Sequence, residues 1–242
     1  MFDVSKKRVL VTGSTQGIGR AIAAAFAGSG ASVWVHGSRQ EKTCRAAGEI
    51  GQGARPAWAD LAQRGAAQAL FEQTGPVDVL VLNASVQFRK AWREITPQEF
   101  ETQVQVNLGS SLALMQLYEP EMAKNHWGRI ITIGSVQQTV PHKDMAVYAA
   151  SKCGLLSLVR NLAKQTAAHG VTINNIAPGA MLTPRNRDVV ADPAYLQKVL
   201  AGIPLGRMGT ERDCSGLCLL LASEEGGYIT GADIYVDGGM SL

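Results

Sequence analysis

Short apolar runs recur along the chain, and segments of helix length separate them. Six runs stand out, and a weaker seventh lies at 55–59. The six are 9–11, 33–35, 77–82, 130–133, 171–176 and 234–236. Their apolar positions are continuous rather than alternating, which is typical of strands that are covered on both faces. The pattern predicts an α/β fold in which a seven-stranded, mostly parallel sheet is doubly wound with helices on both faces.

Two of the segments between the runs carry apolar residues at helical spacing. A helix predicted over 146–169 has a stripe made of Leu155, Leu158, Val159 and Leu162. A second stripe is made of Phe100, Val104, Leu108 and Leu112. Asn107 lies on this same apolar face, which we expect to be buried, one position before Leu108, and a buried amide without hydrogen-bond partners costs about 1–3 kcal/mol. We therefore treat Asn107 as a candidate functional residue.

The stretch 181–193 is the longest one without clear periodicity, and it contains two prolines and several charged residues. It predicts a loop with a short helix, of the kind that closes over a substrate, and we expect a lid over about 181–200. No repeat or linker divides the sequence. We therefore expect one domain over 1–242, with a cofactor-binding half over about 1–150.

Composition and charge narrow the class of partner. The chain is 46% hydrophobic and 18% charged, with a formal net charge of +3 and scattered basic residues. This balance favours a small-molecule substrate over nucleic acid or a membrane surface. No long apolar run or leader is present, so a cytoplasmic protein is expected. The four cysteines have no zinc-like spacing, so no metal site is expected.

A glycine-rich turn follows the first apolar run and precedes a helix of small residues. The turn reads TGSTQGIG at 12–19. Its glycines let backbone N–H groups and the helix N-terminus approach a pyrophosphate. The spacing differs from the GxGxxG pattern, and the Gly-Lys-Ser/Thr of a P-loop is missing. The turn indicates a dinucleotide site, although an ordinary tight turn would also use glycines here.

Tyr148 and Lys152 are one helical turn apart on the predicted helix. A tyrosine side chain ordinarily has a pKa near 10, and lowering it by about three units requires about 4 kcal/mol in favour of the phenolate. An ammonium at about 4 Å supplies this amount at an effective dielectric of about 20. Ser135 follows the apolar run at 130–133, at the edge where open α/β sheets bind ligands. The three residues together predict proton transfer to or from a substrate oxygen.

With these motifs in this order, the sequence closely resembles the short-chain dehydrogenase/reductase family over essentially its whole length. The resemblance implies a Rossmann fold and an oxidoreductase that interconverts a secondary alcohol and a carbonyl with NAD(P). It implies that Tyr148 is the general acid/base and that Ser135 orients the substrate oxygen. Lys152 would hold the nicotinamide ribose and bias Tyr148, and Asn107 would anchor a water in a proton path. It also implies a homotetramer.

The same resemblance implies a set of residues that contact the cofactor. They are Gly13, Thr15, Gln16, Gly17, Ile18, Gly19, Asp60, Leu61, Asn83, Ala84, Ser85, Tyr148, Lys152, Pro178, Gly179, Met181 and Thr183. Ser85 departs from the family, which usually has glycine there. A nucleotide-binding sensor or scaffold without chemistry is the non-enzymatic alternative, and the four intact candidate catalytic residues weigh against it.

The choice of dinucleotide is predicted from the end of the second strand. An acidic residue there would hold the ribose hydroxyls of NAD and repel a 2′-phosphate. The sequence instead has Ser38 and Arg39, and arginine can hold a phosphate by a forked, charge-assisted contact. NADP(H) is therefore favoured, and NAD(H) remains possible.

Candidate substrate residues lie next to the motifs and are mostly polar. They are Gln87, Arg89, Gln137, His142, Met145, Arg185 and Asn186. A polar set favours a small hydroxy or keto compound such as a sugar, polyol, sugar acid or keto acid. The alternative is a 3-oxoacyl-(acyl-carrier-protein) reductase, whose acidic partner would favour a basic rim. Such a rim is available from Arg89, Lys90, Arg93, Arg185 and Arg187.

Overall fold

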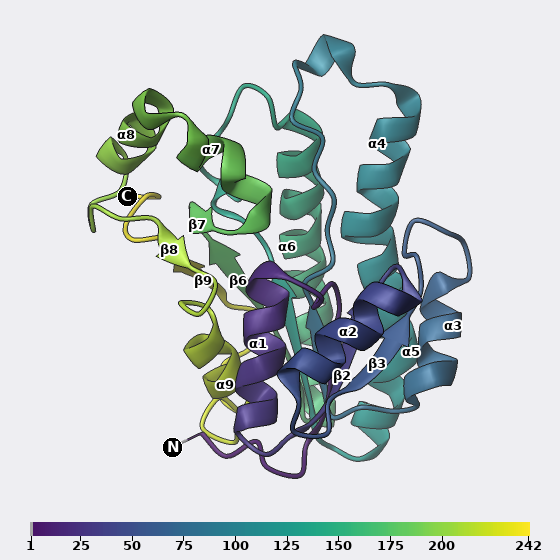
Figure 1. The fold of residues 1–242 in the computed structure, drawn as a ribbon. Coiled ribbons are helices and arrows are strands. Elements are labelled where there is room, and N and C mark those ends of the chain that lie inside the picture. The colour runs from purple at the N-terminus through teal and green to yellow at the C-terminus, as the bar shows by residue number, and fades with distance from the viewer. Residues whose placement is uncertain (1) are drawn as a thin grey trace.

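The computed structural model describes residues 2–242, including every side chain in that range except those of 188 and 189 (Figure 1). The main sheet has the strand order β3-β2-β1-β4-β5-β6-β9, and all neighbouring strands are parallel. The predicted seven-stranded α/β sheet is therefore confirmed. The strands are β1 (Arg8–Val11), β2 (Ser32–Gly37), β3 (Arg55–Trp58), β4 (Val79–Leu82), β5 (Gly128–Ile133), β6 (Val171–Pro178) and β9 (Asp233–Val236).

Helices cover both faces of this sheet, each over its own apolar core. α1, α2 and α9 pack on one face, around Phe26, Ala46 and Leu221. α3, α5 and α6 pack on the other, around Leu70, Tyr118 and Val159. The helices are α1 (Gly17–Gly28), α2 (Gln40–Ile50), α3 (Ala66–Thr74), α4 (Pro97–Val104), α5 (Ser110–Lys124), α6 (Ala146–Thr166), α7 (Arg187–Ala191), α8 (Pro193–Ala201) and α9 (Ser215–Ala222). Within residues 2–242, none of them is long and apolar enough to cross a membrane.

The strand order places a crevice beside the first turn of the chain. β1 pairs with β2 on one side and with β4 on the other, so successive strands are added in opposite directions from β1. The loops that follow β1 and β4 therefore diverge to opposite faces of the sheet. Open parallel sheets bind ligands at this switch point, at the carboxyl ends of the strands.

The stripe at Phe100, Val104, Leu108 and Leu112 does not form a core face, which corrects the prediction. Phe100 is 51% exposed, and the other three are half-buried. A π-helical turn at Gln105–Gly109 joins α4 to α5, and the wider turn shifts the register of buried positions. The face that is buried instead includes Gln103, Val106, Asn107, Ser110, Ser111 and Leu114.

The predicted loop at 181–193 contains more regular structure than expected. It begins with β7 (Met181–Leu182), which pairs with β8 (Gly209–Thr210) in a small parallel sheet. α7 and α8 follow, and Figure 1 shows them together beyond the carboxyl end of β6, on the same side as β7 and β8. Asp192 caps α8 by accepting from the backbone N–H groups of Ala194 and Tyr195. α8 has no fully buried residue, and its apolar side chains pack half-buried against Ile203 and Met208.

Candidate active site

A cavity of about 590 Å³ lies at the carboxyl ends of the parallel strands. It is lined by the loops after β1 to β6 and by part of α8. The predicted site residues that line it are Gly13, Thr15, Gln16, Gly17, Ile18, Gly19, Ser38, Asp60, Leu61, Asn83, Ala84, Ser85, Gln87, Arg89, Ser135, Gln137, His142, Met145, Tyr148, Lys152, Pro178, Gly179, Met181, Thr183, Arg185 and Asn186. Arg39 and Asn107 are not part of this lining.

The glycine turn has the close packing that a dinucleotide site requires. Gly13 and Gly17 have φ of +62°, a conformation that other residues rarely adopt. A Cβ on Gly19 would lie 2.3 Å from the side-chain amide of Asn83, so a larger residue would push Asn83 away. Among the described residues, no side chain hydrogen-bonds to the N-terminus of α1 as a cap. Its N–H groups and positive dipole end therefore fit an anionic phosphate at this end of the cavity.

His36 supports the glycine turn, a role that sequence reasoning missed. Its Nδ1 accepts from the N–H of Gly13 at 3.0 Å, and its Nε2 lies 3.1 Å from the carbonyl oxygen of Ala59. Burial lowers the pKa of His36 to about 4, so the ring is neutral at pH 7 and can fill both roles. The available signal was a polar residue directly after the second apolar run, 33–35.

The end of β2 holds the residues that were predicted to select the dinucleotide. Ser38 lines the cavity, whereas Arg39 is exposed at the N-cap of α2. Lys42, in the first turn of α2, donates from Nζ to Oε1 of Gln16 at 2.6 Å. This contact, which the sequence pattern does not predict, brings a second cation to the glycine turn.

Tyr148 and Lys152 are buried one turn apart near the beginning of α6. The Nζ atom of Lys152 donates to the carbonyl oxygen of Ile133 at 2.7 Å and lies 5.7 Å from the centre of the Tyr148 ring. Burial, with a smaller contribution from the positive charge of Arg185, lowers the pKa of Lys152 to about 7. An anion that enters the cavity would therefore favour the ammonium form of Lys152.

Ser135 lies directly after β5 and begins a short 3₁₀ turn at Val136–Gln138. Its hydroxyl oxygen accepts from the N–H of Gln137, so the hydroxyl hydrogen is left to donate into the cavity. The N–H of Ser135 donates to Oε1 of Gln138. Gln138 in turn donates to the Asp233 carboxylate, and this bond ties the turn to β9. Ser135 is thus held by its own turn and by a neighbouring strand.

Asn107 lies behind the cavity in the π-helical turn, and protein groups use its side-chain amide. Its Oδ1 accepts from the N–H of Val86 at 2.8 Å. Its Nδ2 donates to the carbonyl oxygen of Val86 and to the hydroxyl of Ser151, each at 3.0 Å. Both amide hydrogens are therefore engaged. The buried position that made Asn107 conspicuous in the sequence is explained by a bridge between the β4 loop and α6.

All seven candidate substrate residues line the cavity, together with Tyr195 of α8, which sequence reasoning missed. Arg89 donates from Nη2 to the Tyr195 hydroxyl and also lies 3.1 Å from Nε2 of His142. Arg185 donates from Nη2 to the carbonyl oxygen and to the hydroxyl of Ser85. The serine that replaces the usual glycine at position 85 thus supplies a hydrogen-bond acceptor for Arg185.

Comparison with known proteins identifies the family. A family model described as "Enoyl-(Acyl carrier protein) reductase" matches residues 13–241. Glucose 1-dehydrogenase of Gluconobacter oxydans (strain 621H) is 35% identical over 245 residues, which cover 98% of this chain and 92% of that protein. The 3-oxoacyl-(acyl-carrier-protein) reductase of Escherichia coli (strain K12) is 33% identical over 240 residues, which cover 98% of each chain.

A solved structure agrees with these relatives. The 3-oxoacyl-(acyl-carrier-protein) reductase of Agrobacterium tumefaciens C58, crystallised with NADP bound, superposes with a TM-score of 0.94 at 36% identity. The match covers 98% of this chain and 95% of that one. These relatives are enzymes, and each match covers 98% of this chain. The chain therefore belongs to the short-chain dehydrogenase/reductase family of oxidoreductases.

Proposed function

We propose that this protein is an NADP(H)-dependent oxidoreductase that interconverts a secondary alcohol and a carbonyl on a small polar compound, with Tyr148 as general acid/base. The observation that supports it most directly is the single cavity that joins two sets of residues. One set is the glycine turn at the N-terminus of α1. The other is Ser135, Tyr148 and Lys152 at the ends of β5 and α6.

The roles follow from the positions of the protein groups. Ser135 donates its free hydroxyl hydrogen to the substrate oxygen and holds it toward Tyr148. In alcohol oxidation Tyr148 accepts the hydroxyl proton, and in carbonyl reduction it donates that proton to the oxygen. The ammonium form of Lys152 favours the phenolate of Tyr148 electrostatically. The bound nicotinamide ring would supply the acceptor or donor of the hydride.

NADP(H) is proposed over NAD(H) on two grounds. No carboxylate occurs among His36, Gly37 and Ser38, which line the cavity at the end of β2, and two cations lie close by at Arg39 and Lys42. A 2′-phosphate fits this combination, whereas the ribose hydroxyls of NAD favour an acidic partner. The related reductase of Agrobacterium tumefaciens with NADP bound supports the same choice.

A 3-oxoacyl-(acyl-carrier-protein) reductase is the second candidate, because relatives of this activity match as closely as the glucose dehydrogenase. The basic rim that it requires is weaker in the structure than in the sequence. Lys90 pairs with Glu99 at 2.5 Å, and Arg89 turns toward Tyr195. Turnover of acetoacetyl thioester, compared with sugars, polyols and hydroxy acids, separates the two activities.

The proposed reaction is tested with a panel of alcohols and carbonyls, in both directions, with each dinucleotide. We expect wild type to change the absorbance at 340 nm with at least one polar substrate. Tyr148→Phe should lose at least about 100-fold in kcat on that substrate while retaining NADPH binding, since general acid/base catalysis typically contributes about 10²–10⁴-fold. If Tyr148→Phe kept most of the turnover, the mechanism would be wrong.

A further inference from the structure

The substrate end of the cavity holds a cluster of hydrogen-bond donors made of Arg89, His142 and Tyr195. Arg89 comes from the loop after β4, His142 from the loop before α6, and Tyr195 from α8. All three line the cavity. The guanidinium of Arg89 also lies over the Tyr195 ring, with Cζ 5.2 Å from its centre. We call these three residues the donor cluster.

The protonation of His142 follows from its contacts. The backbone N–H of Asp144 lies 3.1 Å from Nδ1, and an amide N–H can only donate, so Nδ1 accepts. Partial burial and the adjacent charge of Arg89 lower the pKa of His142, which favours the neutral ring. A neutral imidazole that accepts at Nδ1 carries its proton on Nε2. The Nε2 of His142 is therefore a donor.

Two donors then face each other. Nη2 of Arg89 lies 3.1 Å from Nε2 of His142, and guanidinium nitrogens cannot accept. Both atoms can donate to the Tyr195 oxygen, which lies 2.5 Å from Nη2 and 3.4 Å from Nε2. The hydroxyl hydrogen of Tyr195 and the remaining N–H groups of Arg89 are left to other acceptors. The donor cluster has more donors than its own atoms can satisfy.

The surroundings are also positive. Asp60 is the only carboxylate among the described residues that line the cavity, and it follows β3 at the predicted adenine end. No described carboxylate lies within ion-pair distance of Arg89 or Arg185. Oε1 of Gln137, which also lines the cavity, is buried without a hydrogen-bond partner among the described residues, so this acceptor is left for a hydroxyl of the substrate and not for its carboxylate.

We propose that the donor cluster binds a carboxylate of the substrate, so that the enzyme acts on a hydroxy acid or keto acid rather than on a neutral sugar, polyol or thioester. A carboxylate has two acceptor oxygens, and one of them can receive Arg89 and His142 together. Tyr195 joins the contact from α8, so the bound acid would also hold the lid helix against the cavity. This inference rests on the proposed function and specifies its substrate class.

The test measures binding, which keeps it separate from turnover. Isothermal titration calorimetry on the NADPH-loaded protein, which cannot oxidise an alcohol, compares glycerate, threonate and gluconate with glycerol, threitol and glucitol. We expect at least one acid to bind about 10-fold or more tightly than its polyol, because hydrogen bonds to charged groups are worth about 10- to 100-fold in affinity. Arg89→Gln should lose this preference, and Arg89→Lys should keep part of it.

Two further variants complete the test. Tyr195→Phe should weaken the binding of the acid about 3- to 10-fold, which is the range expected for the loss of one hydrogen bond. Arg160→Gln, at an exposed arginine on α6 outside the cavity, should leave all affinities within about twofold. If no acid bound more tightly than its polyol, or if Arg89→Gln kept the preference, the inference would be overturned. Tyr148→Phe should still bind the acid, because Tyr148 is not part of the donor cluster. Unchanged turnover in Tyr148→Phe would therefore contradict the proposed function, whereas a lost preference for acids would contradict this inference.

Discussion

Lys152 combines a proposed catalytic role with an unfavourable environment for its charge. Its amine is fully buried, and its hydrogen bond to the carbonyl oxygen of Ile133 replaces only part of the lost hydration. The folded protein therefore holds the lysine with a pKa of about 7, below the ordinary value of 10.5. Residues placed for chemistry commonly lower the stability of the fold that carries them.

Lys152→Met should remove the destabilisation that the buried lysine causes, and the size of this effect should depend on pH. Between pH 7 and 10.5 the unfolded chain binds a proton that the folded chain does not, so wild-type stability rises with pH across this window. The variant lacks the effect. We expect the free energy of unfolding of Lys152→Met, relative to wild type, to be about 1–3 kcal/mol higher at pH 6.5 than at pH 9.5. Urea unfolding without cofactor measures it, and a pH-independent difference would contradict the prediction. Lys164→Met, at an exposed lysine of α6, is the control.

Arg39→Ala tests the dinucleotide preference at a single residue. Because Arg39 is exposed at the N-cap of α2, its effect should be confined to the 2′-phosphate. We expect the Kd of NADPH to rise about 5- to 20-fold while that of NADH changes less than twofold, measured by fluorescence titration. Arg45→Ala, also exposed on α2, serves as the control. Similar Kd values for NADPH and NADH that Arg39→Ala leaves unchanged would show that the protein has no preference for NADP(H).

At the scale of elements, the π-helical turn at Gln105–Gly109 distinguishes the α4–α5 segment from a regular α-helix. It turns Asn107 inward at the junction of α4 and α5, where the side chain bridges the β4 loop and Ser151 of α6. The same turn moves the stripe that contains Phe100 away from the core. One local widening of the helix is thus associated both with the bridge behind the cavity and with the exposed position of Phe100.

Asn107→Ala should destabilise the protein because it leaves the N–H and C=O of Val86 without their partner. We expect a loss of about 2–4 kcal/mol in the free energy of unfolding, from two to three hydrogen bonds in a buried site. Gln116→Ala, at an exposed position of α5, should cost less than about 0.5 kcal/mol. Urea unfolding followed by circular dichroism checks both. A loss of activity in Asn107→Ala with unchanged stability would instead favour a direct role in proton transfer.

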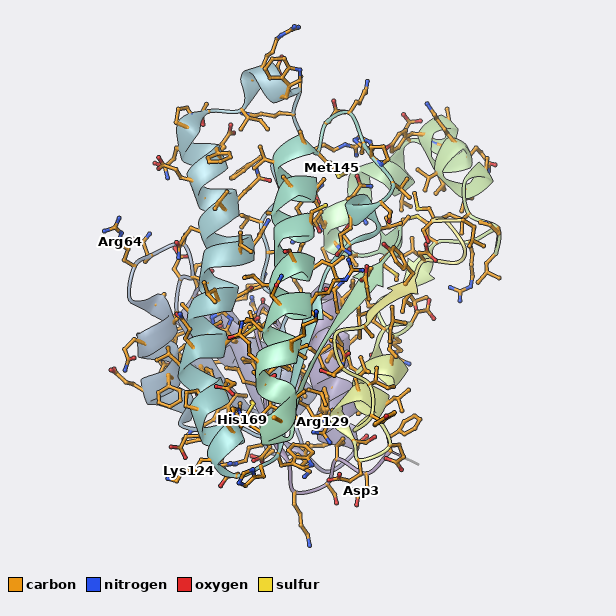
Figure 2. All side chains as sticks on the ribbon, turned by 180° about the vertical axis from the view of Figure 1, so that it is seen from behind. Asp3, Arg64, Lys124, Arg129, Met145 and His169 are labelled. Atoms are coloured by element: carbon orange, nitrogen blue, oxygen red, sulfur yellow. The ribbon has the colours of Figure 1, made fainter. Side chains whose placement is uncertain are left out.

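For the whole molecule, we propose a homotetramer. α6 and the α4–α5 helix lie side by side on the back of the protein (Figure 2), and their outer face carries Phe100 at 51% exposure beside half-buried Val104, Leu108 and Leu112. Figure 2 also shows Met145, which lines the cavity, at the opposite end of the molecule from Arg129 and His169. An assembly through this helical face would leave the cavity end open to substrate.

Phe100→Asp tests this assembly. Four chains of 25.7 kDa should give about 103 kDa for wild type in native mass spectrometry. A charge in an apolar contact is costly to bury, so the variant should shift toward dimers or monomers. Gln68→Asp, at an exposed position of α3, should keep the wild-type mass. A wild-type monomer, or a Phe100→Asp protein with the wild-type mass, would exclude this face as a subunit contact.

The sequence by itself determined the sheet and most of the site. Buried parallel strands leave continuous apolar runs, and turns that bind phosphate require glycine. Both features can therefore be recognised in short stretches of the sequence. Of the predicted site residues, all but Arg39 and Asn107 line one cavity. The roles of Ser135, Tyr148 and Lys152 remain proposals, because they depend on chemistry and not on placement alone.

The tertiary structure alone decided what depends on contacts between distant segments. The support of Gly13 by His36, the contact of Lys42 with Gln16 and the meeting of Arg89 with Tyr195 join residues 23, 26 and 106 positions apart. Periodicity cannot reveal these contacts, because it reports burial and not partners. It also assumed a regular helix through Phe100 and Leu112, whereas packing and buried polar groups favoured a π-helical turn. The donor cluster exists only in the folded chain, and the proposal of an acid substrate therefore depends on the tertiary structure.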